Sequence, residues 1–132
     1  MNLRASSLMV VAAALLAGGS QAQQTAAAGT SPKLDKALAG RTAGQPVDCI
    51  THRAKMQVID DWTILFRERG IVYVQHPRGG CHGLDNGMTL IRDQFATPRM
   101  CAGDINQIID VRTGFGTGAC VYSEFVPYRK AG

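Results

Sequence analysis

The sequence predicts an all-β domain: a small antiparallel β-barrel-like fold of about six short strands, stapled by disulfides and preceded by a short N-terminal helix. From Val47 onward, apolar and polar residues alternate with the period of strands. No second helical pattern follows that point. The chain also has four cysteines, all beyond the N-terminal leader, which in a short exported protein indicates two disulfides.

Residues 1–22 have the features of a secretory signal peptide. Arg4 supplies the positive charge, Leu8–Ala17 is apolar, and small residues precede an expected cleavage after Ala22. A membrane anchor is the alternative, but the apolar run is only about half of the ~20 residues that a span requires. Gly19 stands where a lipoprotein signal would carry its cysteine, which excludes lipid attachment at that site.

Residues 23–46 are expected to form a flexible leader that contains a short helix at 32–39. Pro32 suits the first helical position, and Gly40 can adopt the left-handed conformation that ends a helix. Two leucines one turn apart can pack this helix on the domain. A frayed helix is the alternative, because so short a helix is unstable alone in water.

The β domain is expected at 47–128, followed by a polar tail at 129–132. Its best-defined feature is a hairpin whose turn ends at Gly70, a residue that accepts positive φ. Asp60 and Asp61 are interpreted as turn residues rather than a catalytic pair. The expected strands are 47–50, 56–67 with a bend at 60–61, 71–75, 88–93, 105–111, 119–122 and 125–128.

The four cysteines allow three pairings, and the sequence does not choose among them. We favour Cys81 with Cys101, which would pin a glycine-rich loop to a following strand. Cys49 would then join Cys120 and link the first strand to the last. Each bridge is expected to contribute ~3–4.5 kcal/mol by the loop-entropy argument, which is decisive for a domain this small.

His76, Cys81 and His82 lie close together in the sequence, and with Asp85 they resemble a set of zinc or copper ligands. However, Cys81 cannot be both a disulfide partner and a thiolate ligand. Cys81 and His82 are also adjacent, so their side chains point apart, and no GxSxG, HExxH or SxxK motif occurs. We therefore predict no catalytic residue, no metal and no cofactor.

Two further patterns have simple structural interpretations. Residues 114–118 (GFGTG) superficially match a phosphate loop but lead into a strand, which indicates a hairpin turn. Four arginines are candidates for a patch that binds an anionic partner; ordinary solvated charge is the alternative. They are Arg78, Arg92, Arg99 and Arg112.

The net charge of +4 arises from mixed signs along the chain, without a block of like charge. One Trp, three Tyr and four Phe are too few and too dispersed for a base-stacking platform, so we expect no nucleic-acid partner.

Residues 41–128 resemble a family of short exported bacterial proteins classed only as a domain of unknown function. The resemblance rests on segments spread over nearly the whole domain: Ala39-Gly40-Arg41 with Pro46-Val47-Asp48-Cys49, Val58-Ile59-Asp60, Pro77-Arg78-Gly79-Gly80-Cys81, Cys101-x-Gly103-Asp104-Ile105 and Glu124-Phe125-Val126-Pro127-Tyr128. It implies export and four cysteines that belong together, and it brings no activity.

The function these observations favour is a periplasmic or secreted binding or accessory protein of the cell envelope, without catalysis. The expected recognition face combines the loop 78–87, with Arg78, His82 and Asp85, and the loop 113–118. We expect a monomer without a membrane span after cleavage, whose partner is an envelope protein or a glycan. The alternatives are a small envelope hydrolase or metal-handling protein that uses His76, His82 and Asp85, and a purely structural role.

Overall fold

The computed structural model describes residues 31–92 and 97–132, so the expected signal peptide and the leader up to residue 30 lie outside the described residues. The described chain is mostly β, with one short α-helix and one 3-10 turn, which confirms the all-β class and the helix. The elements are α1 Pro32–Leu38, β1 Arg41–Ala43, β2 Cys49–Thr51, β3 Lys55–Asp60, β4 Thr63–Glu68, β5 Ile71–Gln75, η1 Leu84–Asn86, β6 Met88–Arg92, β7 Arg99–Cys101, β8 Ile105–Asp110, β9 Gly116–Val121 and β10 Phe125–Lys130.

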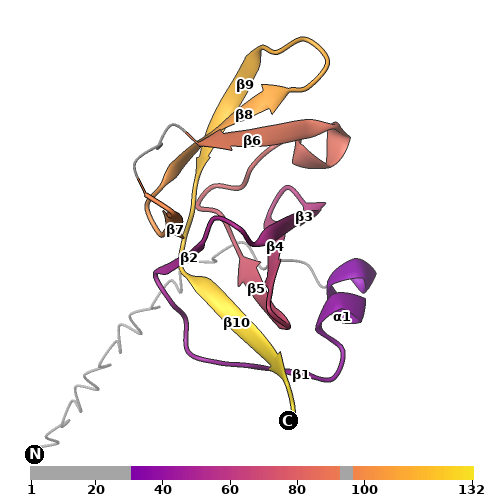
Figure 1. The fold of residues 1–132 in the computed structure, drawn as a ribbon. Coiled ribbons are helices and arrows are strands. Elements are labelled where there is room, and N and C mark those ends of the chain that lie inside the picture. The colour runs from indigo at the N-terminus through magenta and orange to yellow at the C-terminus, as the bar shows by residue number, and fades with distance from the viewer. Residues whose placement is uncertain (1–30, 93–96) are drawn as a thin grey trace, which may run out of the picture.

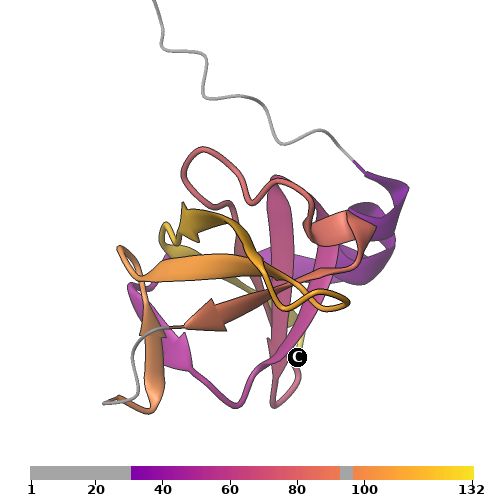
Figure 2. The same ribbon diagram turned by 90° about the horizontal axis from the view of Figure 1, so that it is seen from above.

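The strands form three antiparallel sheets (Figure 1). The largest has the order β1-β10-β5-β4-β3, the second pairs β2 with β7, and the third has the order β6-β8-β9. Viewed from above, the strands of the three-stranded sheet run across those of the five-stranded sheet (Figure 2). The described residues form ten strands rather than about six, and they form no closed barrel, so the barrel-like arrangement is not confirmed.

Two of the expected boundaries are wrong. Residues 41–46 were expected to belong to the flexible leader and 129–132 to be a polar tail outside the β domain, but β1 pairs with the end of β10, with Arg41 opposite Lys130. An isolated bridge between Val47 and Phe125 continues this pairing. A strand of three residues is too short to show a period of two, so only the fold reveals β1.

The predicted hairpin is confirmed as β4 and β5, with Glu68 opposite Ile71. The two residues of its turn both have positive φ, 48° at Arg69 and 79° at Gly70. These values match the type I′ geometry that the right-handed twist of a hairpin favours. The hairpin lies in the centre of the five-stranded sheet, and β4 is buried on both faces.

Each face of this sheet has its own hydrophobic core. On one face, Leu34 and Leu38 of α1 pack against a cluster that includes Leu65 and Val72, so the predicted packing of the helix is confirmed. On the other face, the smaller sheets cover a larger cluster. Its centre is three rings in mutual edge-to-face contact, 5.6–5.8 Å apart: Phe66, Tyr122 and Phe125.

The disulfide pairing we favoured is wrong. Cys49 is bonded to Cys101, because β2 and β7 place these two residues directly opposite each other. Cys81 is bonded to Cys120, because the loop that carries Cys81 lies along the end of β9. The second bridge is buried in the larger core, whereas the first is half-buried at its edge.

A fully buried side chain, Gln75, fixes the connection between β9 and β10. Its amide nitrogen donates to the carbonyl of Ser123 at 2.8 Å. Its oxygen accepts from the backbone N–H and the hydroxyl of Ser123 at 2.8 and 2.9 Å. These three bonds satisfy polar groups that the core would otherwise leave unpaired.

Candidate functional site

The predicted recognition loop, 78–87, is held tightly on the turn between β3 and β4. The carbonyl of Asp61 accepts from the N–H of Cys81 at 2.6 Å, and its carboxylate accepts from the N–H of Gly83 at 2.9 Å. Gly80 has a φ of +76° and packs so closely that an added Cβ would lie 3.1 Å from the carbonyl oxygen of Asp61. These contacts attach the middle of the loop, from Gly80 to Gly83, to the turn between β3 and β4.

The second predicted loop, 113–118, lies near the first, because Met88 at the start of β6 is opposite Asp110 at the end of β8. A hairpin turn is confirmed here, with the N–H of Gly114 donating to the carbonyl of Asp110 at 2.8 Å. The phosphate-loop interpretation is thus excluded, because these residues connect two strands and do not lead into a helix. That these loops form a recognition face stays a prediction.

The structure does not assemble the metal set proposed as an alternative. His82 lies 3.4 Å from a carboxylate oxygen of Asp61, through Nδ1. The Nδ1 of His76 lies 3.1 Å from the carbonyl of Trp62, and Asp85 lies in the exposed turn η1. Within 31–92 and 97–132, no three or more His, Cys, Asp or Glu side chains group closely enough to hold a metal ion.

The four arginines proposed as a patch for an anionic partner do not gather. Arg92 donates to the carbonyl of Arg99 at 2.9 Å, so these two are neighbours. Arg112 follows the far end of β8, beside Asp110, and at about 3.4 Å per residue the length of that strand separates it from Arg92.

A different set of cations gathers at the end of the five-stranded sheet that carries the β4–β5 turn. Four shallow grooves of 440–560 Å³ adjoin one another there, because neighbouring grooves share Arg41, Arg53 or Arg69 in their walls. Ten of the fourteen Lys and Arg residues line them. We call these ten residues the basic band: Lys33, Lys36, Arg41, Arg53, Lys55, Arg67, Arg69, Arg99, Arg129 and Lys130.

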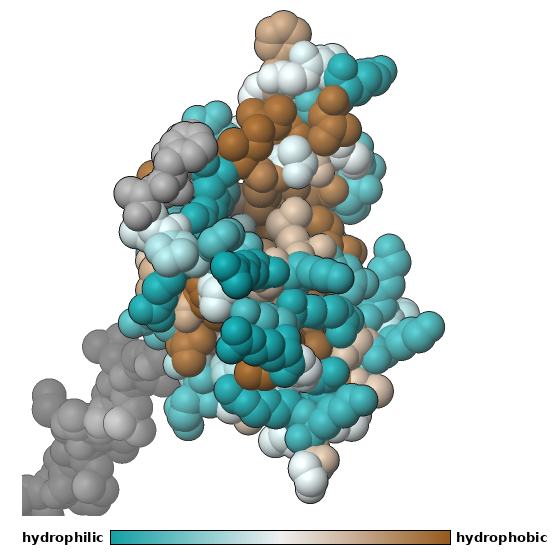
Figure 3. Space-filling model, viewed as in Figure 1, coloured by the Kyte–Doolittle hydropathy of each residue, from teal (hydrophilic) through white to brown (hydrophobic). Residues whose placement is uncertain are grey.

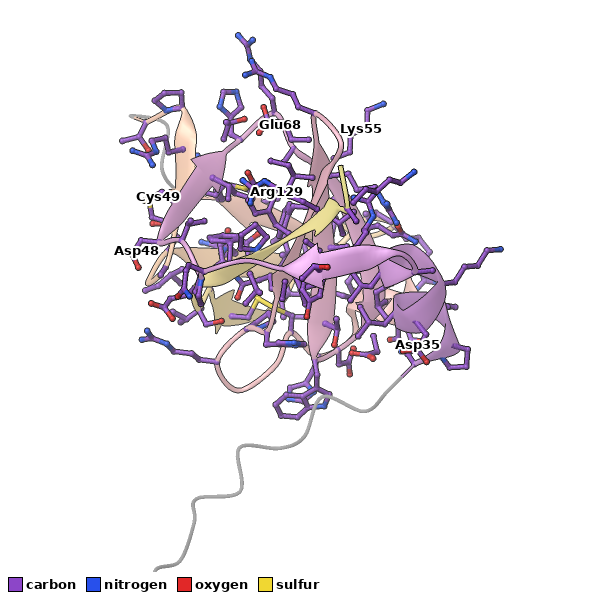
Figure 4. All side chains as sticks on the ribbon, turned by 90° about the horizontal axis from the view of Figure 1, so that it is seen from below. Asp35, Asp48, Cys49, Lys55, Glu68 and Arg129 are labelled. Atoms are coloured by element: carbon purple, nitrogen blue, oxygen red, sulfur yellow. A yellow bond between two sulfur atoms is a disulfide. The ribbon has the colours of Figure 1, made fainter. Side chains whose placement is uncertain are left out.

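The polarity of the surface changes along the molecule. Hydrophilic side chains cover the lower half, over the five-stranded sheet, and apolar side chains gather over β6, β8 and β9 (Figure 3). From below, Lys55, Glu68 and Arg129 project from neighbouring parts of this end, whereas Asp35 lies apart on α1 (Figure 4). Within 31–92 and 97–132, Glu68 is the one carboxylate that lines the four grooves.

Strand register explains why the basic band reaches both faces of the sheet. Lys55 is opposite Arg67, and Arg67 is opposite Val72, whose side chain packs beside α1. Because opposite residues share a face, these cations lie on the α1 side, where Lys33 and Lys36 complete the groove. Arg53 and Arg99 line the groove on the other side, next to β2 and β7.

Two half-buried arginines in the basic band are held by neutral groups. Arg41 donates to the carbonyl of Gly70 at 2.7 Å. Arg67 donates twice to the side-chain oxygen of Gln57, at 3.2 and 3.1 Å. These bonds fix the guanidinium groups without cancelling their charge. Glu68 is mostly buried; it accepts from the hydroxyl of Thr51 at 3.1 Å and lies 4.0 Å from Nε of Arg69. Among the described groove-lining residues, one carboxylate therefore stands against ten cations.

Sequence reasoning missed the basic band because its members come from six separate parts of the chain. The available signal was weak: cations at the start of β3 and at the end of β4, two segments that antiparallel pairing brings together, at Arg53, Lys55, Arg67 and Arg69. The pairing of β1 with β10, which adds Arg41 and Lys130, has no signal in the sequence.

The fold and this surface together define a small disulfide-linked antiparallel β domain with a strongly basic end. Comparisons of the chain with protein-family models, curated proteins and solved structures gave no match. No helix among the described residues is long and apolar enough to cross a bilayer.

Proposed function

We propose that this protein is an exported, non-catalytic binding or accessory protein of the cell envelope, periplasmic or secreted, and that its basic band binds an anionic partner. The observation that carries the proposal is the concentration of ten cations around one end of the sheet, with a single, mostly buried carboxylate among the described residues that line the same grooves. A field of one sign attracts counter-charged ligands over distances comparable to the Debye length, ~8–10 Å at physiological salt.

Export is supported by the signal features of residues 1–22 and by the use of all four cysteines in disulfides. Such bridges persist in oxidising compartments and are rare in the cytosol. The resemblance to exported bacterial proteins agrees with this. N-terminal sequencing of the protein recovered from an envelope extract should begin at Gln23; a protein that begins at Met1 would contradict export.

A binding role is supported by how the cations are held. Arg41 and Arg67 are already fixed by hydrogen bonds, so a ligand orders fewer side chains when it binds. Shallow, open grooves suit contact with a large partner better than enclosure of a reacting group.

The test is salt-dependent retention of the mature protein on immobilised heparin, a generic polyanion. Lys55→Gln/Arg129→Gln removes two exposed cations of the basic band. Arg78→Gln/Arg112→Gln removes two exposed cations outside it, so the two variants have the same net charge. The first variant should elute at clearly lower salt than the second. Equal elution of the two variants, or no retention of the parent protein, would overturn the proposal.

A further inference from the structure

The four grooves of the basic band form one continuous path rather than separate sites. The groove beside α1 and the groove at the β4–β5 turn share Arg41 and Arg67. The latter shares Arg53 and Arg69 with the groove beside β2 and β7. A ligand that follows this path passes around the end of the sheet from one face to the other.

The path is too long for a compact anion. Five strands spaced at about 4.8 Å make the end of the sheet about 19 Å wide. Lys55 on β3 and Arg129 on β10 lie three strand spacings apart in this order, about 14 Å. A single phosphate or carboxylate contacts only one part of such a path, so a ligand that uses both residues carries several charges in a row.

The side chains that line the path favour one class of polyanion over the others. Among the residues that the structure describes, no Phe, Tyr or Trp side chain lines the path, so these residues offer the bases of a nucleic acid no stacking partner. The path also contains none of the large exposed apolar side chains of the described chain, which an interfacial membrane contact would bury. An acidic polysaccharide needs neither a stacking partner nor an apolar contact, because its anionic groups lie along the sugar chain.

We infer that the ligand of the basic band is a linear acidic polysaccharide that lies along the path and contacts cations on both faces of the sheet. This inference rests on the proposed function, and it adds the class and the extended binding mode of the partner. About six simultaneous ion contacts give a slope near −4 in a plot of log K against log salt, at about 0.7 per contact.

The experiment measures Kd for size-defined heparin oligosaccharides, from disaccharide upward, by fluorescence anisotropy at several salt concentrations. Affinity should rise with length until the oligosaccharide spans the path and then level off, with the salt slope steepening in parallel. Lys55→Gln and Arg129→Gln should each weaken binding of the long oligosaccharide by about two- to fivefold, the range of one exposed ion contact. The disaccharide can contact only one of these sites and should respond to at most one of the variants.

Different outcomes of this experiment would contradict different parts of the proposal. If the disaccharide or inorganic phosphate binds as tightly as the long chain, the extended mode is wrong while anion binding by the band stands. If single-stranded oligo(dT) or phosphatidylglycerol vesicles bind more tightly than heparin at equal ionic strength, the polysaccharide assignment is wrong. If no anion binds, both this inference and the proposed function fail.

Discussion

The disulfide pairing gives the sharpest test of the fold, because pairs of cysteine-to-alanine substitutions can either respect or cross the bridges. The bridges span 52 residues, from Cys49 to Cys101, and 39 residues, from Cys81 to Cys120. By the loop-entropy relation, each should contribute ~4 kcal/mol to the free energy of unfolding. The contributions of the two bridges differ by only a few tenths of a kcal/mol in this relation. The burial of each bridge therefore decides which removal lowers the free energy of unfolding more.

Cys81 and Cys120 are 0% and 2% exposed, so their removal also leaves small gaps in the larger core. Cys81→Ala/Cys120→Ala should therefore cost ~1 kcal/mol more than Cys49→Ala/Cys101→Ala. The crossed variant, Cys49→Ala/Cys120→Ala, leaves two cysteines that have no partner in the fold. It should lose ~8 kcal/mol, which exceeds the total stability of many small domains.

The assay is urea unfolding of the mature protein followed by circular dichroism, with thiol titration of each variant. The two matched variants should fold and contain no free thiol. The crossed variant should be unfolded or close to it, with two free thiols. A crossed variant that keeps one disulfide and the stability of a matched variant would refute the pairing. The register of β2 with β7, on which the first bridge depends, would be refuted with it.

Three further changes follow from the cores and the loop. Replacing the fully buried Gln75 with Leu should cost ~1–3 kcal/mol in urea unfolding, because it removes the hydrogen bonds to the half-buried backbone groups of Ser123. A loss below 0.5 kcal/mol would contradict the role of Gln75 in holding the β9–β10 connection. Gly79 and Gly80 both have positive φ, but only at Gly80 would a new Cβ meet backbone, so alanine should cost ~1–2 kcal/mol at Gly79 and clearly more at Gly80. Equal losses of stability in the two variants would show that the loop shifts to accommodate the added Cβ at Gly80. Burial raises the pKa of the Tyr122 hydroxyl well above its ordinary value. The pKa of Tyr122 is thus higher in the folded state than in the unfolded state. The contribution of the neutral hydroxyl to the free energy of unfolding is complete below pH ~10, and it is lost as pH rises beyond that because the unfolded state ionises first. Tyr122→Phe should flatten this alkaline loss in thermal unfolding measured between pH 8 and 11, and an unchanged pH profile would contradict it.

The local parts of the fold were predictable because their signals are local. Alternating apolar residues around a turn that ends at Gly70 define the β4–β5 hairpin, and Pro32 and Gly40 mark the short helix. Asp60 ends β3, and its carboxylate supports the following turn by accepting from the N–H of Trp62 at 2.8 Å. Each of these features depends on residues that are close together in the chain.

The disulfide pairing was mispredicted because it depends on contacts between distant segments. Cys49 meets Cys101 through a two-strand sheet of three residues each, and such short strands have no readable period. The number of bridges followed from counting cysteines, whereas their partners followed only from strand register.

By itself, the sequence determined the class of the domain, its central hairpin, its helix and the number of its bridges, since propensity, periodicity and turn chemistry act between near neighbours. Only the tertiary structure decided which cysteines pair, which face the helix covers and where the charge gathers. Cations from Lys33 to Lys130 become one surface because antiparallel register brings the end of β10 beside β1 and the β4–β5 turn. That register is fixed by burial of both faces of the central sheet, a property of the whole chain rather than of any segment.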